Sequence, residues 1–167
     1  MADQPTPEQF DKLEELIKDV DTCMLVTNDD DMLRSRPMRP VSRLGEDGDR
    51  KLYFYTNRNA PKVDEVKDDS DVNLAFACPE KDVYVSVSGH TRVSHDRAKI
   101  KELWTTPMKA WFPDGPEDES IALLVVDPVA AEYWDAPNST MIHLYGVVKA
   151  TLTGERPSGG DNAKVDL

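Results

Sequence analysis

Two short segments of this sequence carry the side chains best suited to bind an anion. The first, Met32–Gly45, holds four arginines and no acidic residue. The second, Tyr55–Lys62, offers a hydroxyl, then free backbone N–H groups where a helix should begin, then a lysine one turn in. Helix N-termini favour anions, and charge-assisted bonds from Arg and Lys strengthen such sites. Taken singly, the first segment could equally be a basic strand face in solvent and the second a capped helix with an exposed lysine.

The overall charge of the chain makes these basic positions unusual. The 167 residues include 20 Lys and Arg against 32 Asp and Glu, a net charge of −12. Such a surface repels phosphate backbones and anionic lipid, so we expect no nucleic-acid and no membrane partner. No apolar run approaches the roughly 20 residues of a membrane span, and Met1–Pro5 lacks the features of an export signal. A cytoplasmic protein is therefore expected.

The motifs of the common enzyme classes are missing from the sequence. It contains no Walker loop and no GxGxxG, HExxH or GxSxG pattern. His90 and His95, two of the three histidines, are five residues apart across a strand end, which is not the spacing of a metal site. We therefore predict no metal site and leave the catalytic residues unknown.

The periodicity of apolar residues predicts many short strands and few helices. In Val83–Val93, valines alternate with polar residues until Gly89, which indicates a bulge or a close backbone approach. The polar segment Thr153–Leu167 is expected to be loose, which leaves residues 1–152 as a single domain. A mainly β (α+β) barrel with peripheral helices is predicted. Helices are expected at about 6–20, 60–67 and 96–104, and strands at about 22–27, 32–41, 51–56, 71–78, 83–93, 121–126, 132–134 and 141–152.

Several motifs, in this order and spacing, resemble the pyridoxamine-phosphate-oxidase-like superfamily and its bacterial general stress protein subgroup. The resemblance covers roughly Phe10 to Tyr145. It is carried by Ser35-Arg36-Pro37-Met38, Leu52-Tyr53-Phe54-Tyr55-Thr56-Asn57 with Lys62 after it, Tyr84-Val85-Ser86-Val87-Ser88-Gly89, Leu103-Trp104, Trp111-Phe112-Pro113-Asp114-Gly115 and Glu132-Tyr133-Trp134-Asp135.

The resemblance implies an FMN-binding split β-barrel that forms a homodimer with the flavin at the subunit interface. FMN is the cofactor implied, and FAD is possible. By this analogy Arg36 and Lys62 grip the flavin phosphate and Thr56 adds its hydroxyl. The backbone around Pro37, Met38 and Tyr55 would line the ring and the ribityl chain.

Other positions match the family less closely. Tyr84 stands where the oxidase has a glutamine that contacts the ring, and Trp111 could reach the flavin from the partner subunit or belong to the core. The Arg-Lys pair of the family is here Pro61-Lys62, so one cation is missing; Arg58 or Arg34 could replace it.

The function implied is a flavin-dependent oxidoreductase of unknown substrate, linked to the stress response. A non-catalytic flavin-binding module for storage or sensing is the alternative, since it would use the same residues. A third possibility is haem or a deazaflavin on the same fold, with His90 or His143 as the haem ligand. The substrate-binding C-terminal segment of the oxidase has no counterpart, so oxidation of pyridoxamine phosphate is not expected.

Overall fold

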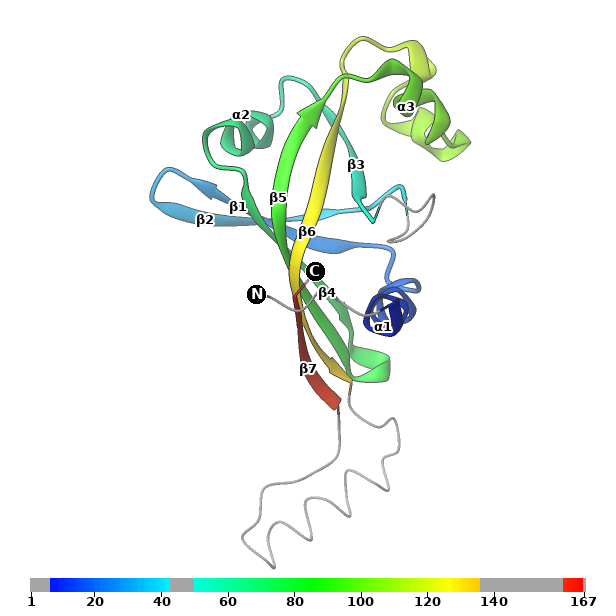
Figure 1. The fold of residues 1–167 in the computed structure, drawn as a ribbon. Coiled ribbons are helices and arrows are strands. Elements are labelled where there is room, and N and C mark those ends of the chain that lie inside the picture. Colours follow the sequence, from blue (N-terminus) through cyan, green and yellow to red (C-terminus); the bar gives the residue numbers. More distant parts are fainter. Residues whose placement is uncertain (1–6, 43–49, 136–160, 167) are drawn as a thin grey trace, which may run out of the picture.

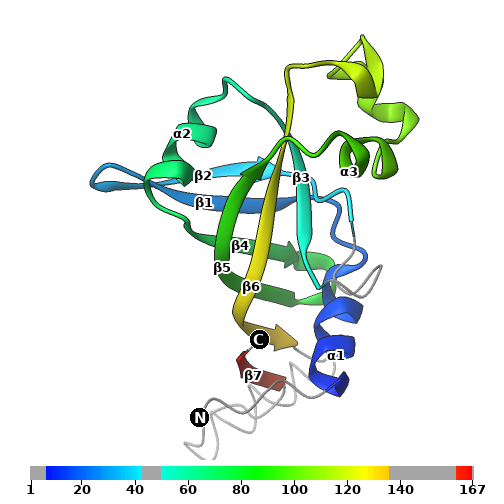
Figure 2. The same ribbon diagram turned by 45° about the horizontal axis from the view of Figure 1, so that its top comes forward.

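The computed structural model describes residues 7–42, 50–135 and 161–166. Antiparallel strands dominate this part of the chain, and helices lie at its periphery (Figures 1 and 2). The helices are α1 (Pro7–Ile17), α2 (Pro61–Asp68) and α3 (Arg97–Glu102), with short 3-10 turns η2 (Pro79–Lys81), η3 (Thr106–Ala110) and η4 (Gly115–Glu117). The strands are β1 (Cys23–Asp29), β2 (Met32–Met38), β3 (Leu52–Asn57), β4 (Asp71–Cys78), β5 (Val83–Ser94), β6 (Ile121–Asp135) and β7 (Asp161–Asp166).

The seven described strands form one curled sheet. Its order is β2-β1-β4-β5-β6-β3, and β7 also pairs with β6. The long strand β6 pairs with β5 along most of its length, while its first half also pairs with β3 and its second half with β7. This arrangement confirms the predicted mainly β fold with peripheral helices (Figure 2).

The core has two parts, and β3 contributes to both. Successive strand residues point to opposite faces, so Leu52 and Phe54 join one apolar cluster while Tyr53 and Tyr55 join the other. The first cluster also holds residues of α1, β1, β4 and β5, and the second holds Ile100 of α3. Because both faces of β3 are buried, the segment that leads into α2 is firmly placed.

Gly89 lies at the bulge that the broken alternation predicted. The pairing of β5 with β6 passes from Ser88–Ala130 to Gly89–Pro128, which leaves Val129 as the extra residue. A Cβ atom at Gly89 would lie 2.5 Å from the backbone oxygen of Asp127. Both predicted features, the bulge and the close backbone approach, are therefore confirmed.

Two sequence expectations differ from the structure. The segments at 121–126 and 132–134 were expected to be separate strands, but they form the single strand β6, because the bulge accommodates Pro128. The tail from Thr153 was expected to be loose, but its segment Asp161–Asp166 pairs with β6 as β7. The rest of that tail and the strand expected at 141–152 lie outside the described residues, and the division at residue 152 stays a prediction.

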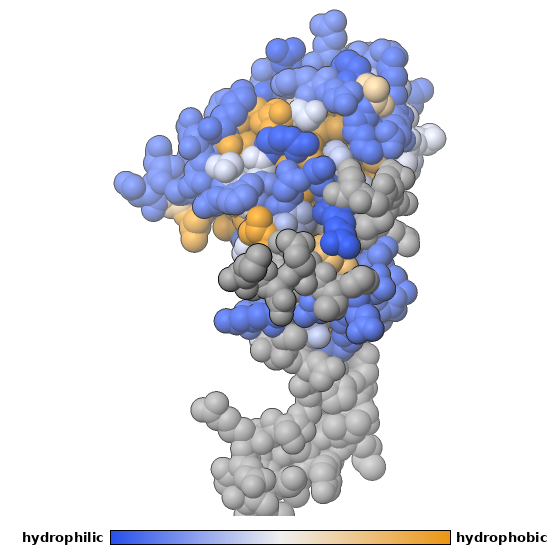
Figure 3. Space-filling model, viewed as in Figure 1, coloured by the Kyte–Doolittle hydropathy of each residue, from blue (hydrophilic) through white to orange (hydrophobic). Residues whose placement is uncertain are grey.

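Large apolar side chains remain exposed at several places on this fold. Hydrophobic residues gather between the β1–β2 hairpin and the region of α3, and more hydrophobic surface lies on the hairpin itself, where Met32 and Leu33 are exposed (Figure 3). None of the described helices is long and apolar enough to cross a membrane. The exposed large hydrophobic residues are Met24, Met32, Leu33, Tyr84, Trp111, Val129 and Trp134.

Candidate functional site

The β1–β2 hairpin places two arginines on the face of the sheet that also carries the core. Its turn is tight, with Asp30 at φ 54°, a left-handed conformation that Asp tolerates. The register pairs Arg36 with Leu25 and Arg34 with Thr27. Because Leu25 and Thr27 are buried, both arginines project from the inner face, at the edge that α2 covers.

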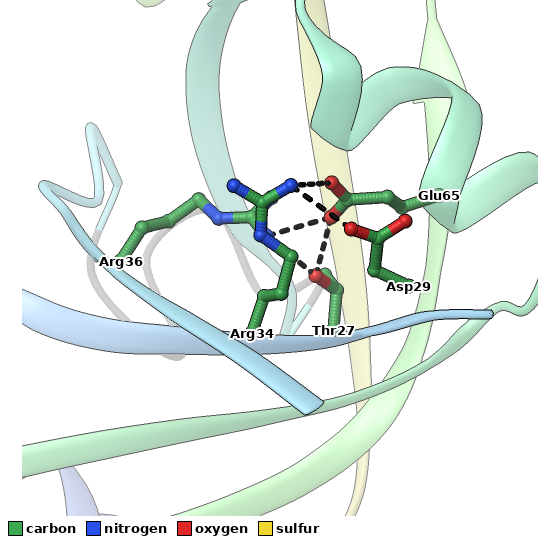
Figure 4. Close-up of polar contacts among 5 residues, drawn as sticks. All are labelled: Thr27, Asp29, Arg34, Arg36 and Glu65. Carbon is green, nitrogen blue, oxygen red and sulfur yellow. Dashed lines mark hydrogen bonds and ion pairs between the residues drawn. The ribbon is translucent and has the colours of Figure 1, made fainter. Parts of the chain in front are cut away.

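Glu65 of α2 is the point where these arginines meet (Figure 4). Its Oε2 lies 2.6 Å from Nη2 of Arg36 and accepts a 2.6 Å hydrogen bond from the Thr27 hydroxyl. Its Oε1 lies 3.5 Å from Nη1 of Arg34, which also donates to Asp29 at 2.9 Å. The Glu65 side chain is only 6% exposed, so this is a buried charge whose cost is offset by paired donors.

Lys62 lies one turn before Glu65 on α2 and is half-buried. Its side chain makes no hydrogen bond or ion pair with any residue that the structure describes. Burial lowers the pKa of Lys62, the nearby Arg36 guanidinium lowers it further, and Glu65 opposes both. The structure thus brings together the two predicted cations, Arg36 and Lys62, and among the described residues the Lys62 ammonium forms no ion pair, although the charge of Glu65 is near it.

The start of α2 has no side-chain cap. Ala60 occupies the N-cap and Pro61 the first helical turn, and no side chain accepts from the N–H groups there. Proline suits this position because its missing N–H would be unpaired in any case. The start of α2 therefore presents a positive dipole end beside Lys62.

A hollow of about 560 Å³ lies beside Arg34, and most of the residues that line it are acidic. An anion would be repelled from it, so the favourable approach to the cations is from the side of Arg36 and Lys62. The hollow is lined by Asn28, Asp29, Asp30, Arg34, Pro61, Asp64, Glu65, Asp68 and Asp69.

Tyr55 directs its side chain away from this cluster. Its hydroxyl donates to the backbone oxygen of Ile100 at 2.6 Å, and its ring packs edge-on against Trp104 with 6.0 Å between centroids. Only the backbone of Tyr55 is then available to a ligand. Thr56, on the opposite face of β3, is buried, and its hydroxyl makes a long 3.4 Å bond to the oxygen of Asn57.

Pro37, Met38, Tyr84 and Trp111 occupy different surfaces. Met38 packs against the first apolar cluster, whereas Pro37 and Tyr84 project from the outer face of the sheet. Tyr84 is 41% exposed and Trp111, between η3 and η4, is 79% exposed. Within one chain, therefore, Tyr84 and Trp111 are not gathered around Arg36 and Lys62.

Two members of the cluster, Thr27 and Glu65, were not predicted from the sequence. A carboxylate on a short helix is normally placed in solvent. The available signal was its spacing: Glu65 stands between the inward-facing Val63 and Val66, one turn after Lys62.

A metal site and a haem ligand are the other two features to compare with the described part of the chain. It has no group of three or more His, Cys, Asp or Glu that could hold a metal ion. His90 is exposed and pairs with Asp71, with 2.8 Å between Nδ1 and Oδ1. His143, the other histidine considered as a haem ligand, lies outside the described residues.

A family model described as "Pyridoxamine 5'-phosphate oxidase like" matches residues 8–158. The chain belongs to this family. The resemblance expected from the motifs is thereby confirmed, including the matches among general stress proteins.

Solved structures agree with the fold. A protein from Jannaschia sp. CCS1, assigned as a candidate general stress protein 26, superposes with a TM-score of 0.74 at 24% identity, over 97% of this chain and all of that one. The general stress FMN/FAD binding protein of Xanthomonas citri has a TM-score of 0.67 at 27% identity, over 81% of this chain and 92% of that one. The predicted split β-barrel class is confirmed by these and related structures.

The match to one curated relative covers only part of that protein. Protein bli-3 of Neurospora crassa is 29% identical over 118 residues, which are 66% of this chain but only 56% of that protein. The chain thus spans little more than half the length of that relative.

Proposed function

We propose that this protein binds FMN and holds the flavin phosphate between Arg36 and Lys62. The observation that carries the proposal is Lys62, a half-buried cation beside Arg36 whose ammonium forms no ion pair with any described residue. Membership of the pyridoxamine 5'-phosphate oxidase like family and structural similarity to an FMN/FAD binding protein support the same ligand. FAD carries a phosphate at the same end of the ribityl chain, so it remains the second choice of flavin.

Arg36 has N–H donors that its contacts with Glu65 and Thr27 leave available to a phosphate. Its Nη2 contacts Glu65 and Thr27, and neither contact uses the hydrogens on Nε and Nη1, which stay available to phosphate oxygens. Arg34 is already paired with Asp29 and Glu65. This favours Arg36 and Lys62, and not Arg34, as the two phosphate cations.

The remaining flavin contacts are proposed on the family resemblance. The backbone of Pro37, Met38 and Tyr55 would follow the ribityl chain and ring, and the hydroxyl of Thr56 would add one bond to the phosphate end. Tyr84 and Trp111 lie on exposed surfaces, so they suit a flavin that sits between two copies of the chain. A homodimer is accordingly part of the proposal.

The chemistry proposed is flavin-dependent oxidation and reduction, linked to a stress response. When bound, the flavin supplies electron transfer, and the chain orients it and excludes water. We assign no acid, base or nucleophile. A non-catalytic flavin carrier or sensor uses the same residues and is the second candidate; a cytoplasmic location stays a prediction from the sequence.

The visible spectrum of the purified protein tests the binding proposal. We expect flavin absorption in the protein as purified, or its recovery as a protein-bound species after addition of FMN. A colourless protein that takes up no added FMN would refute it. Mixing the loaded protein with reduced nicotinamide in a stopped-flow instrument then separates the candidates, because a carrier reduces no faster than free FMN.

A further inference from the structure

Glu65 is a buried carboxylate that no step of flavin chemistry requires. Ionised carboxylates are rarely buried unless they are paired and hydrogen-bonded, since removing the charge from water is costly. The carboxylate of Glu65 is 6% exposed, and it is contacted by Arg36 of strand β2 and by the hydroxyl of Thr27 of strand β1. The buried charge of Glu65 therefore indicates a specific role for this residue.

Oε2 of Glu65, Nη2 of Arg36 and the hydroxyl of Thr27 contact one another in a triangle. Nη2 of Arg36 lies 2.6 Å from Oε2 of Glu65 and donates to the Thr27 hydroxyl at 2.9 Å. That hydroxyl in turn donates to the same Oε2 at 2.6 Å. Two of these three contacts converge on Nη2 of Arg36 and so hold that end of the guanidinium in place (Figure 4).

The charge of Glu65 also matters to Lys62. Arg36 and Lys62 repel each other, and two unscreened cations in a partly buried place would move apart. Glu65, on the same helix as Lys62, attracts both. It therefore lowers the cost of keeping two cations side by side before any anion arrives.

We propose that Glu65 is the positioning residue of the phosphate site: it holds Nη2 of Arg36 so that the remaining guanidinium hydrogens, together with Lys62, face the phosphate. This inference rests on the proposed FMN site and goes beyond it. Glu65 does not touch the ligand; it acts through Arg36, with Thr27 as the third member of the triangle.

The opposite role for Glu65 makes a different prediction. If its carboxylate merely neutralised Arg36 and competed with the phosphate, its removal would tighten FMN binding. If it positions Arg36, its removal weakens FMN binding although a negative charge has been taken away. The sign of the change therefore decides between the two roles.

Two variants and one matched control test the proposal on the full-length protein. Glu65→Gln keeps the shape and removes the charge, and Glu65→Asp keeps the charge and withdraws it by one methylene. Asp64→Asn removes an exposed charge from the same helix, away from Arg36. Dissociation constants for FMN and riboflavin are measured by quenching of flavin fluorescence, with circular dichroism to confirm folding.

We expect both Glu65 variants to lose about ten-fold in FMN affinity, since part of a charge-assisted bond is lost, while riboflavin binding and the Asp64→Asn variant stay unchanged. A folded Glu65→Gln or Glu65→Asp protein that binds FMN as tightly as the wild type, or more tightly, overturns the proposal. If Glu65→Gln does not fold, Glu65→Asp decides. A wild type that does not prefer FMN to riboflavin refutes the phosphate site itself, and this is seen before any variant is made.

Discussion

Arg36 and Glu65 lie 29 positions apart in the chain, yet Nη2 of Arg36 is 2.6 Å from Oε2 of Glu65. Strand β2 supplies the arginine and helix α2 the carboxylate, and the Thr27 hydroxyl of β1 joins them. The contact uses Nη2 of the guanidinium and does not involve its Nε and Nη1 hydrogens. Beside it stands Lys62, and this pair of cations is the basis of the first prediction below and of the closing test.

Replacement of Lys62 by alanine should weaken FMN selectively. The lost charge-assisted bond is worth about 1.5–3 kcal/mol, or roughly ten- to a hundred-fold in affinity. Riboflavin, which lacks the phosphate, should bind as before. Lys67→Ala is the control, since Lys67 is exposed on the same helix; equal losses for both ligands in Lys62→Ala would show that Lys62 supports the fold and not the phosphate.

Replacement of Trp111 by alanine should leave stability unchanged, because the side chain is 79% exposed. If Trp111 covers the flavin from a partner subunit, flavin affinity should nevertheless fall, for FMN and riboflavin alike. Thermal unfolding of the apoprotein and titration with both ligands measure the two effects. Unchanged affinity for both flavins would remove Trp111 from the proposed site.

Gly89→Ala should destabilise the fold at the bulge. The new Cβ would lie 2.5 Å from the Asp127 backbone oxygen, where no flexible side chain can give way. We expect a loss of about 1–3 kcal/mol in the free energy of unfolding, as for other overpacked sites. Urea unfolding measures it, with Ser88→Ala, at an exposed neighbouring position, as the control; a loss no larger than in that control would contradict the close approach.

Tyr55→Phe should cost stability without affecting FMN. It removes the 2.6 Å bond to the Ile100 oxygen and leaves a buried acceptor unpaired, worth about 1–3 kcal/mol. Burial raises the pKa of Tyr55 from 10.0 to about 12. The neutral phenol therefore favours the folded state, and its contribution is present below about pH 10 and is lost as the pH rises toward 12. Urea unfolding between pH 8 and 11 should show this loss in the wild type and not in Tyr55→Phe; weaker FMN binding by the variant would mean that the side chain reaches the ligand.

Much of the fold could be predicted from local pattern. The alternation in β5 and the apolar spacing in α1 and α2 record which face is buried, and Gly89 marked the bulge. The continuity of β6 could not be predicted in the same way, because Pro128 normally ends a strand and is tolerated here only by the bulge opposite Gly89. The strand β7 was missed because Asp161–Asp166 is mostly polar, and its two apolar residues, Ala163 and Val165, give only a weak alternation.

The sequence predicted Arg36 and Lys62 of the site but not Glu65, and the reason is physical. Arg36 and Lys62 are visible as basic positions in an acidic chain. Glu65 is one acid among 32, and its burial depends on contacts with Arg36 and Thr27 that are distant in sequence. Charges are buried where partners meet in three dimensions, and local periodicity carries little of that information.

The most direct test of the central claim is the ratio of the wild-type dissociation constants for riboflavin and FMN, measured by titration of the apoprotein. If Arg36 and Lys62 hold the phosphate, FMN should bind at least about ten-fold more tightly than riboflavin, because charge-assisted bonds of about 1.5 kcal/mol or more are available only to FMN. Equal affinity for the two ligands, or tighter binding of riboflavin, would contradict the account.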